Sequence, residues 1–294
     1  MALALARGIA AGDNAPMRFL TVPAPAKLNL FLHVTGRRPD GYHTLESAMV
    51  ALDYGDSITL TRRDDGEIVR RSELPGVAVD DDLTIRAARA LQRASGTPQG
   101  ADVDVVKRIP QGGGLGGGSS DAASVLLALN RLWRLGLTRA DVMRIALPLG
   151  ADVPFFVFGE PALARGIGER LTALSLPARW VAVIAPPIVV PTAAVFASAE
   201  LTRDTPSAKM SVFSEGYGRN DLQPVAGARF PGIAEALAAL RKSSPEARMT
   251  GSGGCVFAPF VTEAEARQAI ANRPAGMGGF VARTLARHPL IGFA

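Results

Sequence analysis

The chain has 294 residues, is 48% hydrophobic and 20% charged, and carries a formal net charge of +5 at pH 7, which fits one large or two ordinary domains with a full core. A single cysteine, Cys255, excludes an internal disulfide and agrees with a cytoplasmic protein, while Pro186 and Pro187 interrupt the longest apolar run, so no transmembrane helix is predicted. Acidic clusters such as residues 80–82 are mixed with the basic side chains, so the charge suits an anionic small molecule better than a nucleic acid.

The first patterned stretch is a predicted strand over residues 22–34. Residues 1–18, which precede it, have no regular hydrophobic pattern and no apolar segment typical of a secretory signal, so we predict a disordered leader. Alternation along the strand places Leu28, Leu30 and Leu32 on one face and Lys27, Asn29, Phe31 and His33 on the other. Lys27 and Asn29 are therefore expected to project together, although a lysine on a solvated strand edge is the plainer interpretation.

Residues 37–44 form a turn-rich segment whose tip carries Tyr42 and His43, and exposed aromatic side chains on loops often contact ligands. Residues 48–60 indicate a pair of strands that turn at residues 53–56. An amphipathic helix over residues 83–95 follows, and Asp82 is placed to cap its N-terminus.

A glycine-rich loop over residues 112–118 is the strongest signal in the chain. Alternating apolar residues from Val103 to Ile109 predict a strand before it, and helical spacing predicts a helix over residues 122–133 after it. Backbone N–H groups at the start of a helix, approached without interference from side chains, form a phosphate site.

Three other interpretations of this loop are weaker. A dinucleotide fingerprint would need an acidic residue at the end of a second strand, but Asp141 opens a helix instead. A Walker A loop would need Lys followed by Ser or Thr after its last glycine, and here Gly118 is followed directly by Ser119. A flexible linker is disfavoured because both flanks are strongly patterned.

The second half of the chain alternates between predicted helices and strands. Asp152 is placed to cap a short helix that has Pro154 in its first turn, and Thr192 is placed to cap another. Glycines between residues 251 and 254 indicate a second close approach of backbone before a strand, and Cys255 is interpreted as a small core residue. The remaining predicted elements are helices over residues 137–147, 220–240 and 262–272, and strands over residues 180–190, 255–260 and 279–284.

Four separated motifs resemble one family. The stretch PQGGGLGGGSSDAA at residues 110–123 is similar to the phosphate loop of the GHMP kinases, which include homoserine, mevalonate and galactose kinases. The motifs PAKLNL at residues 25–30 and GYH at residues 41–43 resemble the branch that phosphorylates a cytidine-diphosphate-linked sugar alcohol, and GADVPFF at residues 150–156 matches a family motif as well. The resemblance extends from about residue 22 to about residue 280.

The resemblance implies an α+β fold with two domains: a ribosomal-protein-S5-like, ATP-binding domain over residues 19–165 and a ferredoxin-like domain over residues 166–294, with the site between them. It implies ATP and Mg²⁺ as cofactors, with metal ligands that the sequence leaves unknown, and we expect a monomer or weak homodimer. Asp82 departs from the Asn that is common near the adenine in this family, so capping is its safer role.

The resemblance also assigns site residues. The implied catalytic pair is Asp152, as the base, and Lys27, beside the transferred phosphate. The implied ATP-binding residues are Lys107, Pro110, Gln111, Gly112, Gly113, Gly114, Leu115, Gly116, Gly117, Gly118, Ser119 and Ser120. The implied substrate-binding residues are Asn29, Tyr42, His43, Thr192, Phe196, Gly251, Ser252 and Gly253, with His43 bonded to cytosine and Phe196 stacked on it.

Three other functions stay open at this point. A sister GHMP kinase or a diphosphomevalonate decarboxylase would share the glycine loops but lack a pocket formed by His43, Thr192 and Phe196. A non-catalytic ATP-binding module would bind the nucleotide without transferring phosphate. A basic RNA-binding protein would bind RNA with strong salt dependence.

Overall fold

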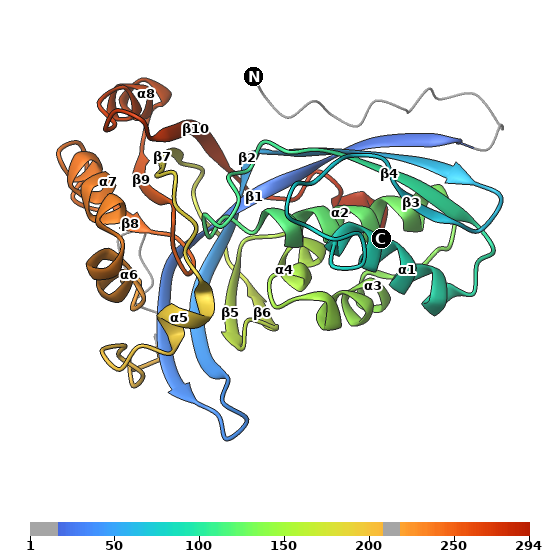
Figure 1. The fold of residues 1–294 in the computed structure, drawn as a ribbon, viewed down its shortest axis with the longest axis horizontal. Coiled ribbons are helices and arrows are strands. Elements are labelled where there is room, and N and C mark those ends of the chain that lie inside the picture. The colour runs from blue at the N-terminus through green and yellow to red at the C-terminus, as the bar shows by residue number, and fades with distance from the viewer. Residues whose placement is uncertain (1–16, 208–217) are drawn as a thin grey trace.

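The computed structural model describes residues 17–207 and 218–294 (Figure 1). The predicted leader lies outside the described residues except for its last two. Met17 packs against the hydrophobic core, and the carbonyl oxygen of Arg18 accepts a hydrogen bond from the N–H of Arg62. The described helices and strands confirm the predicted α+β class, and none of these helices combines the length and the apolar character needed to cross a bilayer.

Two long antiparallel strands, β1 (Phe19–Arg37) and β2 (His43–Arg63), run through both halves of the molecule (Figure 1). The predicted pair of strands over residues 48–60 is wrong, because β2 continues without a turn through residues 53–56. Gly55 explains the difference: a Cβ at this position would collide with the backbone of Ala24, so glycine serves the close approach of β1 rather than a turn.

A bulge in β1 changes which side chains share a face. The register with β2 shifts between Asn29 and Phe31. Beyond this shift Leu32 lines the same cavity as Lys27 and Asn29, while Phe31 packs into a separate core cluster. The predicted alternation therefore holds for Lys27 and Asn29 but is wrong for Phe31 and Leu32.

The first half of the molecule is a sheet covered by helices (Figure 1). Strand β2 pairs with β4 (Gly100–Val106) and β5 (Ala162–Gly166), β4 pairs with β3 (Ile68–Arg70), and β5 pairs with β6 (Arg170–Ala173). The helices of this half are α1 (Leu83–Ser95), α2 (Gly117–Leu132), α3 (Arg139–Ala146), the short 3₁₀ helix η1 (Leu147–Leu149) and α4 (Val153–Phe158). Helix α2 begins five residues earlier than predicted, because the last glycines of the loop join its first turn.

The second half is a smaller layer of strands and helices. Its strands are β7 (Trp180–Ala185), β8 (Arg248–Met249), β9 (Val256–Phe260) and β10 (Gly278–Leu285), and its helices are α5 (Thr192–Phe196), α6 (Gln223–Arg229), α7 (Pro231–Arg241) and α8 (Glu263–Ala271). Strand β7 ends five residues earlier than predicted, because Pro186 and Pro187 follow it and proline cannot donate to a ladder. Strand β10 pairs with both β7 and β2 and so joins the two halves.

The two halves also meet at the C-terminus, where the 3₁₀ helix η3 (Ile291–Phe293) returns to the first half (Figure 1). There the side chain of Asn130 donates to the carbonyl oxygen of Phe293, and the N–H of His288 donates to the carbonyl oxygen of Gly159. The predicted domain boundary between residues 165 and 166 lies inside β5, so a division after β6 would keep the β5–β6 hairpin whole.

Candidate active site

The glycine loop connects β4 to α2, and its local geometry follows from its residues. Gly112, Gly114 and Gly116 have φ angles of 67°, 76° and 71°, which side chains rarely tolerate. Gly116 occupies the N-cap position of α2, and no side chain caps the helix. The first N–H groups of α2 are therefore left for a ligand at the positive end of the helix dipole.

A second reason for the glycines is contact with the loop over residues 250–254. A Cβ on Gly114 would collide with the carbonyl oxygen of Thr250, and a Cβ on Gly113 would lie 2.5 Å from the Sγ of Cys255. The N–H of Cys255 donates to the carbonyl oxygen of Gly113 at 3.0 Å, and Cys255 is buried as predicted. The phosphate loop thus needs glycine partly because another backbone packs on it.

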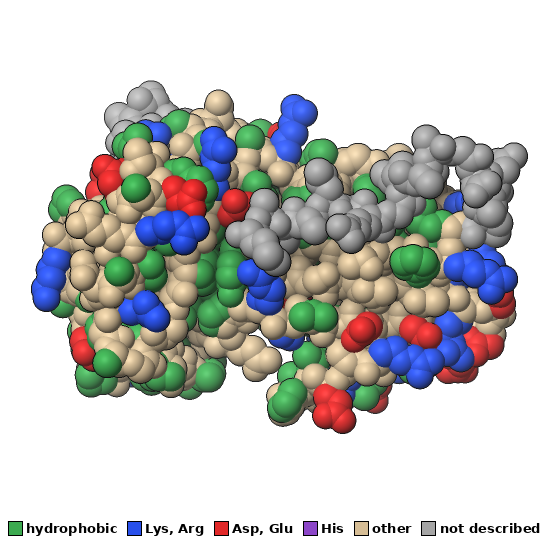
Figure 2. All heavy atoms as spheres, turned by 90° about the horizontal axis from the view of Figure 1, so that it is seen from above, with side chains coloured by type: hydrophobic (Ala, Val, Ile, Leu, Met, Phe, Trp, Pro, Cys, Tyr) green, Lys and Arg blue, Asp and Glu red, His purple; other side chains and the backbone are tan. Residues whose placement is uncertain are grey.

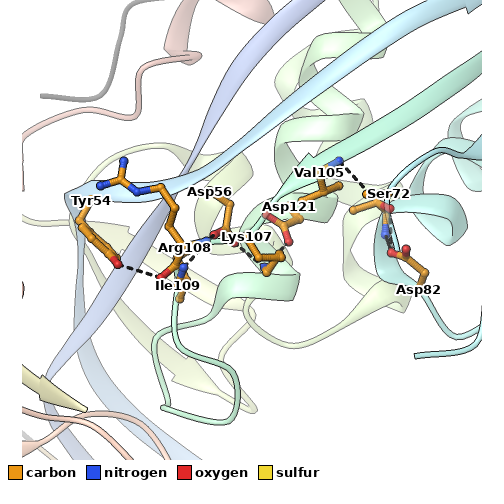
Figure 3. A network of polar contacts seen from close by, with 10 residues as sticks. Tyr54, Asp56, Ser72, Asp82, Val105, Lys107, Arg108, Ile109 and Asp121 are labelled. Carbon is orange, nitrogen blue, oxygen red and sulfur yellow. Dashed lines mark hydrogen bonds and ion pairs between the residues drawn. The ribbon is translucent and has the colours of Figure 1, made fainter. Parts of the chain in front are cut away.

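The start of the loop is anchored by a buried cluster that the sequence analysis missed (Figure 3). Lys107 donates both to Asp56 on β2 and, at 2.6 Å, to Asp121 on α2. Asp56 also accepts the backbone N–H groups of Arg108 and Ile109. One side chain of β2 therefore fixes both the ammonium group and the backbone at the entrance of the loop.

One ammonium group does not neutralise two buried carboxylates. Burial raises the pKa of Asp121 to about 7, an effect that Lys107 opposes and the neighbouring Asp56 reinforces. Burial disfavours the charged form of Lys107, but the two carboxylates outweigh it and raise the pKa of the lysine. One oxygen of Asp121, Oδ1, is buried without a hydrogen-bond partner among the described residues.

A cavity of about 450 Å³ lies along this loop. Its lining includes most of the residues that the sequence predicts to bind ATP: Lys107, Pro110, Gln111, Leu115, Ser119 and all the glycines from 112 to 118. Ser120 does not line it, because its N–H donates to the carbonyl oxygen of Gly116 inside the helix and its hydroxyl is buried. At another wall Asp82 accepts from the N–H of Thr84 at 2.9 Å, which confirms its capping role.

A second cavity, of about 290 Å³, contains the predicted catalytic pair. The Nζ atom of Lys27 lies 3.4 Å from Oδ2 of Asp152 and also donates to the side chain of Asn29. Asn29 donates in turn to the hydroxyl of Ser47 at 2.7 Å, and that hydroxyl donates to the carbonyl oxygen of Phe31 at 2.6 Å. This chain of hydrogen bonds fixes Lys27, which is 3% exposed.

Asp152 occupies the N-cap position of α4 but does not cap it. Its φ and ψ of −89° and −13° are helical rather than extended, and its side chain makes no capping hydrogen bond. The Asp152 side chain is 36% exposed and lines the second cavity, where Lys27 is its ion-pair partner. The sequence allowed two roles for Asp152, a helix cap and a catalytic base. The structure shows no hydrogen bond that would support the role of a helix cap.

The two cavities share a wall made of Gly114, Gly116, Ser119, Thr192 and Ser252. The hydroxyls of Thr192 and Ser252 lie 2.6 Å apart, so they link helix α5 to the glycine loop over residues 250–254. Thr192 is not the cap of α5, because Pro191 holds that position and the hydroxyl bonds elsewhere. Phosphate bound in one cavity would face a group bound in the other across this wall.

Part of the predicted substrate pocket also lines the second cavity. Phe196 lines the cavity together with Gly251 and Ser252, and the ring of His43 stacks on Phe196 with centroids 5.1 Å apart. Burial lowers the pKa of His43, as do the charges of two arginines nearby. Three of the predicted substrate-binding residues line neither cavity. His43 meets the cavity lining only through its stack on Phe196, Tyr42 is 63% exposed, and a Cβ on Gly253 would face Val190.

Comparisons with known proteins define the class. Residues 82–160 match the model of the GHMP kinases N terminal domain, and residues 199–277 match that of the GHMP kinases C terminal. The chain is thus a small-molecule kinase of the GHMP type. A homoserine kinase from Cytophaga hutchinsonii, 17% identical with a TM-score of 0.70 over 96% of this chain and 98% of its own, shares the fold.

More similar relatives narrow the class. A 4-diphosphocytidyl-2-C-methyl-D-erythritol kinase from Thiobacillus denitrificans is 56% identical over 92% of this chain and 97% of its own, and one from Cupriavidus necator is 54% identical over 95% and 97%. A crystal structure of 4-(cytidine 5'-diphospho)-2C-methyl-D-erythritol kinase is 33% identical, with a TM-score of 0.78 over 90% of this chain and 98% of that one. The chain belongs to the 4-diphosphocytidyl-2-C-methyl-D-erythritol kinase family of GHMP kinases.

Proposed function

We propose that the chain phosphorylates the 2-hydroxyl of 4-diphosphocytidyl-2-C-methyl-D-erythritol with ATP, in the non-mevalonate route to isoprenoid precursors. Three relatives that are 52–56% identical to the chain are named as kinases of this compound. The observation that carries the proposal is the pair of Lys27 and Asp152, 3.4 Å apart in a cavity that shares a wall with the cavity of the glycine loop. A phosphate donor and an alcohol acceptor would meet at this wall.

Binding of ATP is the first step. The N–H groups of residues 112–119 would donate to the phosphates, and the dipole of α2 would favour their negative charge. The cluster of Asp56, Lys107 and Asp121 would keep the loop in place before the nucleotide arrives. Because phosphoryl transfer depends mainly on position and charge, a loop that is already ordered lowers the cost of binding.

Transfer of the phosphoryl group would use the pair in the second cavity. Asp152 would accept the proton of the attacking hydroxyl, since its carboxylate is free of any capping bond. Lys27 would hold that carboxylate and offset the negative charge that develops on the transferred group. Asn29 and Ser47 would keep the ammonium group in position through their hydrogen bonds.

Mg²⁺ is the metal expected with ATP. Among residues 17–207 and 218–294 there is no group of three or more His, Cys, Asp and Glu side chains that would hold a metal ion. Mg²⁺ is bound by oxygen ligands. Ser119, in the wall that the two cavities share, has a hydroxyl oxygen that could bind it. We propose that the ATP phosphates supply most of its ligands, with Ser119 as the protein contact. Bound there, Mg²⁺ would neutralise phosphate charge during transfer.

The cytidine end of the substrate would lie beside Phe196, which lines the second cavity and on which His43 stacks. Cys255 is a free, buried thiol, which suits the cytoplasm where we propose that the enzyme works, as a monomer or a weak homodimer. On the face shown in Figure 2, Lys and Arg side chains are interspersed with Asp and Glu rather than gathered into one basic stripe. Such a surface favours a small-molecule partner over RNA.

The test replaces Asp152 with Asn and measures ADP release with the cytidine-linked alcohol and with plain alcohols. We expect kcat to fall by about 10²–10⁴ with an unchanged melting temperature, because Asp152 caps nothing. The matched control is Asp141→Ala, which removes a carboxylate from the capping box of α3, and Asp141 lines neither cavity. It should lower the melting temperature and leave kcat alone. A D152N enzyme with normal kcat would place the base elsewhere, and a wild-type enzyme that prefers plain alcohols would refute the substrate.

A further inference from the structure

The backbone of Arg108, at the entrance of the glycine loop, is held by two side chains of β2. The hydroxyl of Tyr54 donates to the carbonyl oxygen of Arg108 at 2.8 Å, and the carboxylate of Asp56 accepts the N–H of the same residue. Figure 3 shows both side chains directed at this residue from β2. The two bonds lie on either side of the Arg108 Cα, so together they fix the peptide planes through which the chain enters the loop.

The ring of Tyr54 is oriented by the strand that joins the two halves. It stacks on the ring of Phe280 in β10, with centroids 3.7 Å apart and an angle of 7° between the planes. The guanidinium of Arg108 lies 4.9 Å from the centroid of the Tyr54 ring, within the range of a cation–π contact. One residue before Tyr54, the carboxylate of Asp53 accepts the N–H of Arg283 at 2.7 Å, which ties β10 to β2. The direction of the Tyr54 hydroxyl is therefore set by packing between β2 and β10.

The hydroxyl is the part of Tyr54 that packing alone does not explain. A phenylalanine would keep the stack on Phe280 and the contact with the core cluster that both rings border. The hydroxyl adds the bond to Arg108. Burial raises the pKa of Tyr54 above its ordinary 10, although the charge of Arg108 opposes this, so the hydroxyl keeps its proton at neutral pH. A phenolic donor at this position therefore serves the loop rather than the core.

The residues that follow Arg108 belong to the proposed nucleotide site. Ile109 and Pro110 line the cavity of about 450 Å³, whereas Tyr54 and Arg108 line neither cavity. Tyr54 would thus act on a nucleotide through the backbone rather than by contact. Because proline fixes its own φ, few free rotations separate the peptide plane held by Tyr54 from Gly112, and an error in that plane is carried into the loop.

We propose that Tyr54 is a positioning residue that holds the glycine loop in its nucleotide-binding conformation through the carbonyl group of Arg108, and that Phe280 orients the Tyr54 ring for this bond. The part played in nucleotide binding rests on the proposed function, but the hold on the loop does not. Without the bond, a nucleotide has to order the loop entrance when it binds, so its affinity falls. The net effect of one hydrogen bond corresponds to a change in affinity of about 3- to 10-fold.

The first test measures the loop without any ligand. Hydrogen exchange of the backbone amides over residues 107–118 should be faster by about 3-fold or more in Tyr54→Phe than in the wild-type enzyme, while exchange in α1 stays the same. Ser124→Ala is the matched control, because its hydroxyl also donates to a carbonyl oxygen, that of Pro23 at 3.0 Å, and Ser124 lines neither cavity. Equal exchange over residues 107–118 in Y54F and wild type would overturn the proposal, as would the same acceleration in S124A.

The second test measures nucleotide affinity and turnover. In Y54F we expect the Kd and the KM for ATP to rise about 3- to 10-fold, with the KM for the cytidine-linked alcohol unchanged and the melting temperature lowered by no more than about 2 °C. Phe280→Leu should raise the Kd for ATP in the wild-type background but not in Y54F, because it acts through the hydroxyl. An unchanged Kd in Y54F would refute the role of Tyr54, and additive effects of the two substitutions would refute that of Phe280. If the wild-type enzyme binds no ATP, the proposed function has failed, and the exchange rates still decide whether Tyr54 holds the loop.

Discussion

Replacing Asp121 with Asn is expected to stabilise the chain at neutral and alkaline pH. Asp121 is 3% exposed and shares Lys107 with Asp56, so the cluster contains two buried carboxylates and one ammonium group. Burial raises the pKa of Asp121 to about 7 from its ordinary 3.8. The amide keeps the shape and can still accept from Lys107, but it removes the charge that burial disfavours.

The sign of the pH dependence follows from where the proton is held. Between pH 4 and pH 7 the folded chain keeps a proton on Asp121 that the unfolded chain has released. The folded state therefore loses stability as the pH rises through this range, and above pH 7 the loss is complete. The difference between the two pKa values corresponds to about 4 kcal/mol. This is an upper limit for the free energy of unfolding that Asp121→Asn gains at pH 8, and it equals a rise in melting temperature on the order of 10 °C.

The assay is thermal melting of both proteins from pH 4 to pH 8.5, read as the difference between them. The difference is needed because His288 has the opposite effect on the pH dependence of stability, and it is common to both proteins. Asp56→Asn serves as the contrast, because Asp56 accepts two backbone N–H groups and its amide should destabilise at every pH. A gap between D121N and wild type that stays constant with pH would refute the reasoning.

Three further predictions concern the site and the core. Lys27→Met should lower kcat by about 10²–10³ and leave ATP affinity unchanged, because the glycine loop holds the nucleotide. Turnover and nucleotide titration of the same variant test this prediction, and a normal turnover would contradict it. Gly114→Ala should lower the melting temperature because its Cβ meets Thr250. Gly118→Ala lies at a helical position where the added Cβ would meet only the side chain of Leu83, at an ordinary contact distance of 3.4 Å, so it should leave the melting temperature equal or higher; equal effects of the two would be the contrary result. Burial lowers the pKa of His288 to about 3, so His288→Asn should lose less stability than wild type when the pH falls from 6.5 to 4, and parallel melting curves over that range would count against this.

The sequence by itself determined the helices and loops that depend on interactions between residues close together in the chain. The helix over Leu83–Ser95 was predicted to the residue, because its apolar spacing and its Asp82 cap lie within one stretch of chain. The phosphate loop was predicted for a similar reason, since glycines before a helix free its N–H groups wherever they occur. The family resemblance added Lys27 and Asp152, and the structure brings them within 3.4 Å.

Tertiary structure decided what depends on distant segments. The bulge in β1 that places Leu32 beside Lys27 comes from the register with β2, which no alternation in β1 encodes. Asp56 reads as a turn residue in the sequence and becomes the anchor of a loop 51 residues later, because only folding brings β2 under that loop. The bond between Arg203 and His43 spans 160 residues and leaves no periodic pattern in the chain. Side-chain pairing across such separations is fixed by packing of the whole sheet, and a local pattern carries no record of it.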